Sequence, residues 1–311
     1  MTLVLLVVVG LAGSGLALVR GAELVDVRGA PGLRVLEGDV VPAVGRQMQE
    51  APRSARVLRL DAGPTTTFQL LHADGPQLAD TSVVLAHRAL TADADPPAEA
   101  LATAVASLVG GVDDDRSALV DLGVGAVLVG PTTDEDARGA LLARLDAYAG
   151  LERVADGATG TVWRVAVPAG ESAGTATVTG WARLLDGSGA GLVVPSDGRS
   201  IDVRLRASDL AELGTTAGTG WDVQPGTRTL VLAERAAPGW RATLDGRRLE
   251  VAQRVPEGAW QQTFALPAEG GGRLEVWYES PGGTWWRVAL VATAVIYGLL
   301  VVPVRRRVVE R

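Results

Sequence analysis

Two uncharged apolar runs at opposite ends of this chain constrain everything that lies between them. The first covers Thr2–Val19 and the second covers Val288–Val304. A helix needs about 20 mainly apolar residues to cross the hydrocarbon core of a bilayer, and each run is close to that length. The sequence therefore predicts two transmembrane helices, at residues 1–20 and 285–304, which hold the intervening chain on one side of the membrane.

The flanks of the second run predict its orientation. They carry Trp285 and Trp286 before the run and Arg305, Arg306 and Arg307 after it. Indole rings favour the membrane interface, and arginines beside a span favour the cytoplasmic side. We expect these five residues to anchor the helix in the lipid bilayer, with a basic cytoplasmic tail at 305–311. The protein would be a multi-pass protein of the cell membrane, with the bulk of the chain extracytoplasmic. A buried helix of a soluble protein fits these flanks less well.

The first run is open to three interpretations. It predicts a transmembrane helix or uncleaved signal anchor, but small residues at 13–15 could also lie near a signal-peptide cleavage site. No basic residue precedes the run, which is unusual for a signal peptide. The missing basic flank also suggests that the chain is the tail of a longer multi-span protein.

Composition excludes several classes of function. The chain has no cysteine, lysine or asparagine, and all 29 basic residues are arginine. It therefore offers no disulfide, no thiolate and no N-glycosylation site. Residues 21–284 contain 35 acidic and 23 basic residues, a balance of −12, because six arginines and one glutamate lie outside this segment. This acidity argues against nucleic acid as a partner and against peripheral binding to anionic lipid.

The first half of the outer segment, residues 21–168, alternates between helical and strand patterns. Helical patterns cover 40–50, 98–109, 116–122 and 134–149. Strand patterns cover 56–60, 66–71, 123–130, 151–154 and 161–167, and the irregular stretch 74–97 predicts a loop. Strands that alternate with helices predict a small extracytoplasmic α/β domain.

The second half changes character after a linker at 169–174. Strand patterns cover 175–185, 191–195, 201–207, 227–234, 240–244, 248–252, 261–266 and 273–279. The turns between them are rich in Gly, Asp and Pro, and Asp245–Gly246 is typical of a hairpin. Residues 175–284 therefore predict an all-β sandwich of the jelly-roll or immunoglobulin-like kind.

Four short motifs in this half carry a resemblance. They are Pro238–Gly239–Trp240, Asp245–Gly246, Phe264–Pro267 and Val276–Tyr278, and they are followed by an apolar run with a basic tail. In this order they resemble the C-terminal extracytoplasmic region of actinobacterial multi-span membrane glycosyltransferases of the family-two type or related polytopic proteins. The strand at Leu119–Val129 is similar as well, although Ala126 stands where an aromatic residue is common. The resemblance spans roughly residues 100–311.

The resemblance implies a role in cell-envelope polysaccharide synthesis. In such transferases the catalytic acids lie in other parts of the protein, so it implies no catalytic residue and no cofactor in this chain. A non-catalytic part of a glycosyltransferase could guide a lipid-linked sugar or an envelope glycan. The alternative is a stand-alone anchored protein that binds a glycan or an envelope partner. A hydrolase is a third reading, but the sequence has no triad or paired-carboxylate motif for it.

Acidic motifs and histidines give no metal site. The Asp-x-Asp spacing of metal-dependent transferases occurs at Asp93–Asp95, Asp113–Asp115 and Asp134–Asp136. Three matches in an acidic chain are better explained by helix capping and solvation. His72 and His87 lie at a spacing that matches no zinc arrangement.

The tryptophans are the best candidates for binding, because indole faces stack on the C–H surfaces of sugars. Trp221 and Trp260 lie beside glycines or turns, and the sequence predicts them as glycan contacts. A role in the hydrophobic cores is the expectation for Trp163, Trp181, Trp240 and Trp277.

Overall fold

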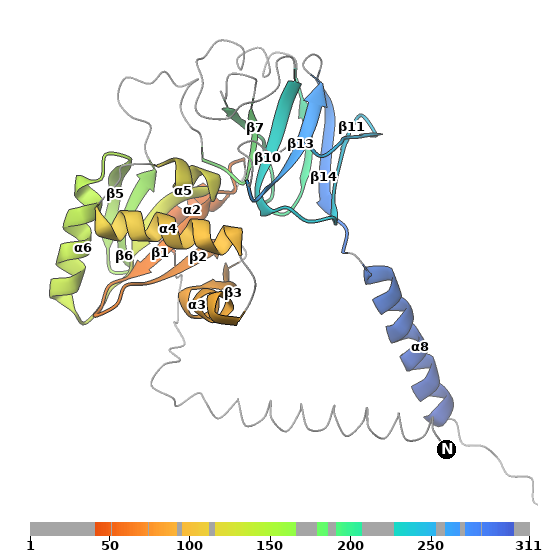
Figure 1. The fold of residues 1–311 in the computed structure, drawn as a ribbon, viewed down its shortest axis with the longest axis horizontal. Coiled ribbons are helices and arrows are strands. Elements are labelled where there is room, and N and C mark those ends of the chain that lie inside the picture. The colour runs from red at the N-terminus through yellow and green to blue at the C-terminus, as the bar shows by residue number, and fades with distance from the viewer. Residues whose placement is uncertain are drawn as a thin grey trace, which may run out of the picture. The chain divides into compact units, whose positions relative to one another are not determined.

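The computed structural model describes most of the chain between residues 41 and 301. The described ranges are 41–50, 52–73, 75–91, 95–111, 116–165, 179–185, 191–206, 227–252, 259–267, 271–280 and 282–301. Within them the fold is rich in β-strands and has few helices (Figure 1). The two predicted end segments at 1–20 and 305–311, the linker at 169–174 and Trp221 lie outside the described residues.

Six strands of the first half form one mixed sheet. They are β1 (Arg56–Asp61), β2 (Thr67–His72), β3 (Gly75–Thr81), β4 (Val124–Val129), β5 (Leu151–Gly157) and β6 (Gly160–Val165). Their order in the sheet is β3-β2-β1-β4-β6-β5. The β1 and β4 strands pair in parallel, and the other neighbours are antiparallel.

Helices bury both faces of this sheet. The helices are α2 (Ala43–Gln49), α3 (Ser82–Thr91), α4 (Pro96–Gly110), α5 (Ser117–Asp121) and α6 (Glu135–Ala147). One core joins the apolar sides of α4, α5 and α6 to alternate residues of the central strands, such as Leu58 and Val127. The α2 helix contacts β1 and β4 from the other face, and every residue of β4 is buried. The uninterrupted apolar run of β4 is thus the pattern of a strand covered on two sides.

The second half forms two four-stranded antiparallel sheets around a separate core. Its strands are β7 (Ala182–Leu185), β8 (Gly191–Val193), β9 (Ile201–Leu205), β10 (Thr227–Arg235), β11 (Trp240–Leu244), β12 (Arg247–Arg248), β13 (Gln261–Pro267) and β14 (Gly272–Tyr278). The strand orders are β13-β10-β7-β8 and β12-β11-β14-β9. Side chains from both sheets, including Phe264 and Leu274, form the shared core together with Trp181, which precedes β7.

Two motifs of the β-rich half have clear structural reasons. Asp245 and Gly246 both have positive φ, as a two-residue hairpin turn requires, which confirms the predicted turn between β11 and β12. A Cβ at Gly239 would lie 2.5 Å from the carbonyl oxygen of Glu279. Glycine in the Pro-Gly-Trp motif therefore allows the start of β11 to approach the end of β14 closely.

The two halves meet through a hydrogen-bonded junction. The Ser54 hydroxyl donates to the carbonyl of Ser196 at 2.6 Å, and the Trp181 amide donates to the carbonyl of Arg53 at 3.0 Å. A Cβ at Gly123 would lie 2.9 Å from the Cβ of Ala233 on β10, so glycine is needed there as well. These contacts hold β10 and its neighbours against the amino ends of β1 and β4.

The C-terminal helix α8 (Gly283–Val301) covers most of the second apolar run. The side chains of Val288, Val291 and Ile296 on this helix are exposed, and so are those of Trp285 and Trp286. By length and mean hydropathy, no helix in the described part of the chain qualifies as a membrane span.

Three expectations from the sequence are wrong. The stretch 74–97 is not a loop, because it contains β3, α3 and the start of α4. The strand expected at 248–252 is only the two-residue β12. Trp277 is not a core residue, since it is 41% exposed on β14. Trp163 and Trp181 are buried as expected.

Candidate functional site

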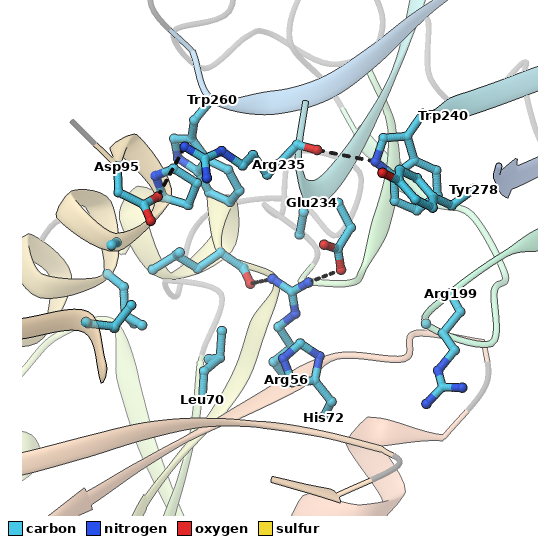
Figure 2. A pocket seen from close by; sticks show the side chains of 17 residues that line it. Arg56, Leu70, His72, Asp95, Arg199, Glu234, Arg235, Trp240, Trp260 and Tyr278 are labelled. Atoms are coloured by element: carbon cyan, nitrogen blue, oxygen red, sulfur yellow. Dashed lines mark hydrogen bonds and ion pairs between the residues drawn. The ribbon is translucent and has the colours of Figure 1, made fainter. Parts of the chain in front are cut away.

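A cavity of about 400 Å³ lies where the two halves meet. The first half contributes residues of β1, β2, α3 and α4, and the second contributes β10, β11, β14 and the loop before β9. Its polar and aromatic lining residues are Arg56, His72, Asp95, Arg199, Glu234, Arg235, Trp240, Trp260 and Tyr278. Figure 2 shows these side chains around the cavity.

Arg56 is the most buried charged residue of the site, at 5% exposure. It begins β1, and its Nη1 donates to the carbonyl of Leu122 at 3.1 Å. Its Nη2 donates to Oε1 of Glu234, which lies near the end of β10 in the other half. Trp181 Nε1 donates to the same oxygen at 3.0 Å. Glu234 therefore joins the strands of both halves at the base of the site.

A second ion pair lies at the start of α4. Arg235 Nη2 is 3.6 Å from Oδ1 of Asp95, the residue that precedes α4. Two adjacent residues of β10 thus pair with two different segments of the first half. Glu234 pairs with Arg56 on β1, and Arg235 pairs with Asp95 before α4. Both carboxylates that line the large cavity are paired with arginines. Each carboxylate has further acceptor sites that can take hydrogen bonds from ligand hydroxyls.

Aromatic rings form two separate surfaces of the cavity. Trp240 and Tyr278 make an edge-to-face pair with ring centroids 5.2 Å apart, and the Trp240 ring is 6.0 Å from that of Trp181. Trp240 Nε1 donates to the carbonyl of Arg235 at 3.3 Å, which fixes its ring. Trp260, which precedes β13, lies away from this pair in Figure 2, near Asp95.

A smaller cavity of about 60 Å³ adjoins the first. The two share Arg56, His72, Gly198 and Arg199. The loop 197–200 is held by Asp197, whose Oδ1 accepts from the amides of Arg199 at 2.8 Å and Ser200 at 2.5 Å. Burial alone would raise the pKa of Asp197, but the hydrogen bonds from Ser200 and Arg199 outweigh it and lower that pKa below its ordinary value.

The residues singled out from the sequence fall in different places. Trp260 lines the cavity, and Trp285 and Trp286 belong to α8. Of the acidic motifs, Asp95 lines the cavity, and Asp134 caps α6 by accepting from the Ala137 amide at 3.0 Å. Among the residues that the structure describes, no group of three or more His, Asp and Glu side chains could hold a metal ion.

Sequence reasoning missed most of the site. Arg56 and Glu234 had no motif of their own, and Tyr278 was noted only as the end of the Val276–Tyr278 motif. Trp240, which was expected in the core, packs against that core and also lines the cavity. The available signals were the Pro-Gly-Trp motif, which sets Trp240 at the start of β11, and the Val276–Tyr278 motif, which ends in Tyr278. No family model, curated protein or solved structure matches this chain.

Proposed function

We propose that the cavity at the junction of the two halves binds a glycan and that the chain is a non-catalytic, extracytoplasmic part of a bacterial membrane glycosyltransferase system. The observation that carries the proposal is the lining of the cavity. Trp240, Trp260 and Tyr278 provide ring surfaces for the C–H faces of a sugar, and Arg56, Glu234 and Asp95 provide polar groups for its hydroxyls. A concave site with aromatic walls and a few placed polar groups is the usual form of a small-molecule site.

The chemistry of this lining favours binding over catalysis. Glu234 and Asp95 are each engaged by an arginine. The resemblance of the Pro238–Tyr278 region to the tails of membrane glycosyltransferases supports an envelope glycan or a lipid-linked sugar as the ligand. It also supports the finer fold description, in which a small α/β domain and a jelly-roll or immunoglobulin-like sandwich stand between membrane helices. A stand-alone anchored glycan-binding protein would use the same cavity.

Glycan binding is tested with the full-length chain in detergent on an array of bacterial envelope glycans. We expect binding to at least one glycan, and a loss of about tenfold or more for Trp240→Ala and Trp260→Ala because each removes a stacking surface. Trp277→Ala is the matched control, since Trp277 is exposed on the same strand as Tyr278 but does not line the cavity. Absence of binding to every glycan, or equal losses for Trp240→Ala and Trp277→Ala, would contradict the proposal.

We also propose that α8 holds the chain at the membrane, with the bulk of the protein outside the cell. Its exposed apolar side chains favour an apolar environment, and in the sequence the uncharged run continues to Val304. Extraction of membranes with alkaline carbonate should leave the chain in the pellet, and external protease should digest it in intact cells. Release by carbonate, or full protection from the protease, would exclude this placement.

A further inference from the structure

We infer that the ligand of the junction cavity is an uncharged saccharide and that Arg56 Nε donates to one of its oxygens. The inference rests on the proposed glycan binding and specifies the chemical class of the glycan. It follows from the charges of the lining and from one buried donor that the protein leaves unsatisfied.

The lining of the two adjoining cavities is balanced in charge. It contains three arginines, Arg56, Arg199 and Arg235, and three carboxylates, Asp95, Asp197 and Glu234. Glu234 pairs with Arg56, and Asp95 lies 3.6 Å from Arg235. The Asp197 carboxylate accepts from backbone amides and from the Ser200 hydroxyl. The arginines and carboxylates of the lining are therefore equal in number, and each carboxylate has partners within the protein.

A charged ligand would disturb this balance. The carboxylate or phosphate of an acidic sugar would lie in one cavity with Glu234 and Asp95, and their like charges would repel it at short range in a partly buried site. A cationic sugar would meet Arg56 and Arg235 in the same way. A neutral sugar meets neither penalty, because hydroxyl groups both donate to carboxylates and accept from guanidinium groups.

Arg56 supplies the unsatisfied donor. Its Nη1 and Nη2 have the partners described above, but its Nε is buried and has no hydrogen-bond partner among the described residues. A buried donor without an acceptor is costly, so an acceptor delivered to it stabilises a complex. Arg56 lines both cavities, and the smaller one offers several times the space that one water molecule needs. A sugar hydroxyl or ring oxygen has the size and the neutral acceptor character that fit this position.

Matched pairs of oligosaccharides test the charge rule. Cellotetraose, mannotetraose and galactotetraose are each titrated into the full-length chain in detergent at pH 7, beside the same tetramer oxidised at C6 to the uronate. We expect at least one neutral tetramer to bind, with its uronate at least about tenfold weaker. A uronate that binds as tightly as its neutral partner would overturn the inference and leave glycan binding intact. If no tetramer of either kind binds while the envelope-glycan array does, the charge rule is rejected for short oligosaccharides; if the array is blank too, the proposed function fails with it.

Two variants test the part assigned to Arg56. Arg56→Lys keeps a cation opposite Glu234 but removes Nε, and we expect it to weaken binding of the neutral tetramer about tenfold. Glu234→Gln removes an anion from the site, so the uronate should gain affinity relative to its neutral partner. Circular dichroism and the melting transition of each variant show whether it is folded. An Arg56→Lys protein that is folded and binds as the wild type does would contradict the role of Nε, and an unchanged preference in Glu234→Gln would contradict the charge rule.

Discussion

At the scale of single residues, Arg56 and Glu234 connect the two halves and form the base of the site. The guanidinium of Arg56 is almost fully buried, whereas the side chain of Glu234 is 32% exposed. A buried ion is tolerated only when it is paired and hydrogen-bonded, and this one has a carboxylate and a carbonyl as partners. Removal of one partner is therefore more harmful than the loss of a surface pair.

Glu234→Gln should lower the free energy of unfolding by about 2 kcal/mol, because it leaves the buried charge of Arg56 without a counter-ion. The matched control is Glu152→Gln, which breaks a pair with Arg164 in which both side chains are about half exposed. The control should change stability by less than about 1 kcal/mol. Urea titration of the three proteins measures the difference, and equal midpoints for the two variants would contradict the role given to Glu234.

Asp197 makes the stability of the folded chain depend on pH in the acidic range. Its pKa is lower in the folded chain than its ordinary value, so its contribution to stability is complete above the unfolded value of about 3.9. This contribution is lost as the pH falls through the lower folded value. The stability difference between wild type and Asp197→Asn should thus be constant above about pH 5 and should shrink below it. Thermal melts between pH 7 and pH 2 test this, and a difference that grows toward acid pH would reverse the sign.

At the scale of secondary-structure elements, close approaches between backbone segments require glycine at several turns. The hairpin of β5 and β6 pairs Gly157 with Gly160, but only Gly160 has a positive φ, at +128°. A Cβ on Gly160 would lie 2.3 Å from the carbonyl oxygen of Val129 on β4. The β6 strand can approach β4 this closely only because Gly160 has no side chain.

Gly160→Ala should destabilise the protein by about 3 kcal/mol, from the positive φ together with the clash against β4. Gly157→Ala is the control, since a Cβ there would meet no atom within 4 Å. It should change stability by less than about 1 kcal/mol. Denaturant midpoints distinguish the two variants, and a Gly160→Ala protein as stable as Gly157→Ala would refute the account of this turn.

The elements that the sequence predicted well are those with strong local signals. The apolar run of β4, the helix α4 and the Asp-Gly turn after β11 all have patterns that do not depend on distant residues. By contrast, β3 has Pro76 near its start, and α3 opens with no acidic residue in its first turn. The β3 strand forms because it pairs with the edge of β2, a tertiary contact that local patterns cannot predict.

The site was beyond prediction for a related reason. Arg56 and Glu234 are 178 residues apart in the chain, and neither belongs to a motif. Trp260 could be proposed because aromatic residues beside turns are often exposed, and it does line the cavity. Its partners in the lining come from the other half and from β11 and β14, so only the folded arrangement brings them together.

At the scale of the whole molecule, the junction between the two halves determines whether the site exists. Besides Arg56 and Glu234, Arg183 Nη2 on β7 donates to Oδ1 of Asp121 at 2.8 Å at the end of α5. The side chain of Arg183 is 5% exposed, so the arginine of this pair is buried. The site therefore depends on polar contacts that hold the halves in one arrangement.

Asp121→Ala should increase local opening in both halves, because it leaves Arg183 buried and unpaired. We expect faster amide hydrogen exchange in β4 and in β7, measured by mass spectrometry on the full chain. Asp202→Ala is the control, since it breaks an exposed pair with Arg273. Faster exchange in β7 alone would show that the junction does not couple the halves.

The most direct test of glycan binding at this junction is the response of the tryptophan indole N–H signals to a bound neutral oligosaccharide. We predict that titration of the full-length chain in detergent shifts the signals of Trp240 and Trp260, which line the cavity. The signal of Trp163, which is buried and bonded to Asp146 at 2.9 Å, and that of the exposed Trp277 should stay in place. Shifts confined to Trp277, or a saturable interaction that leaves Trp240 and Trp260 unmoved, would contradict the account.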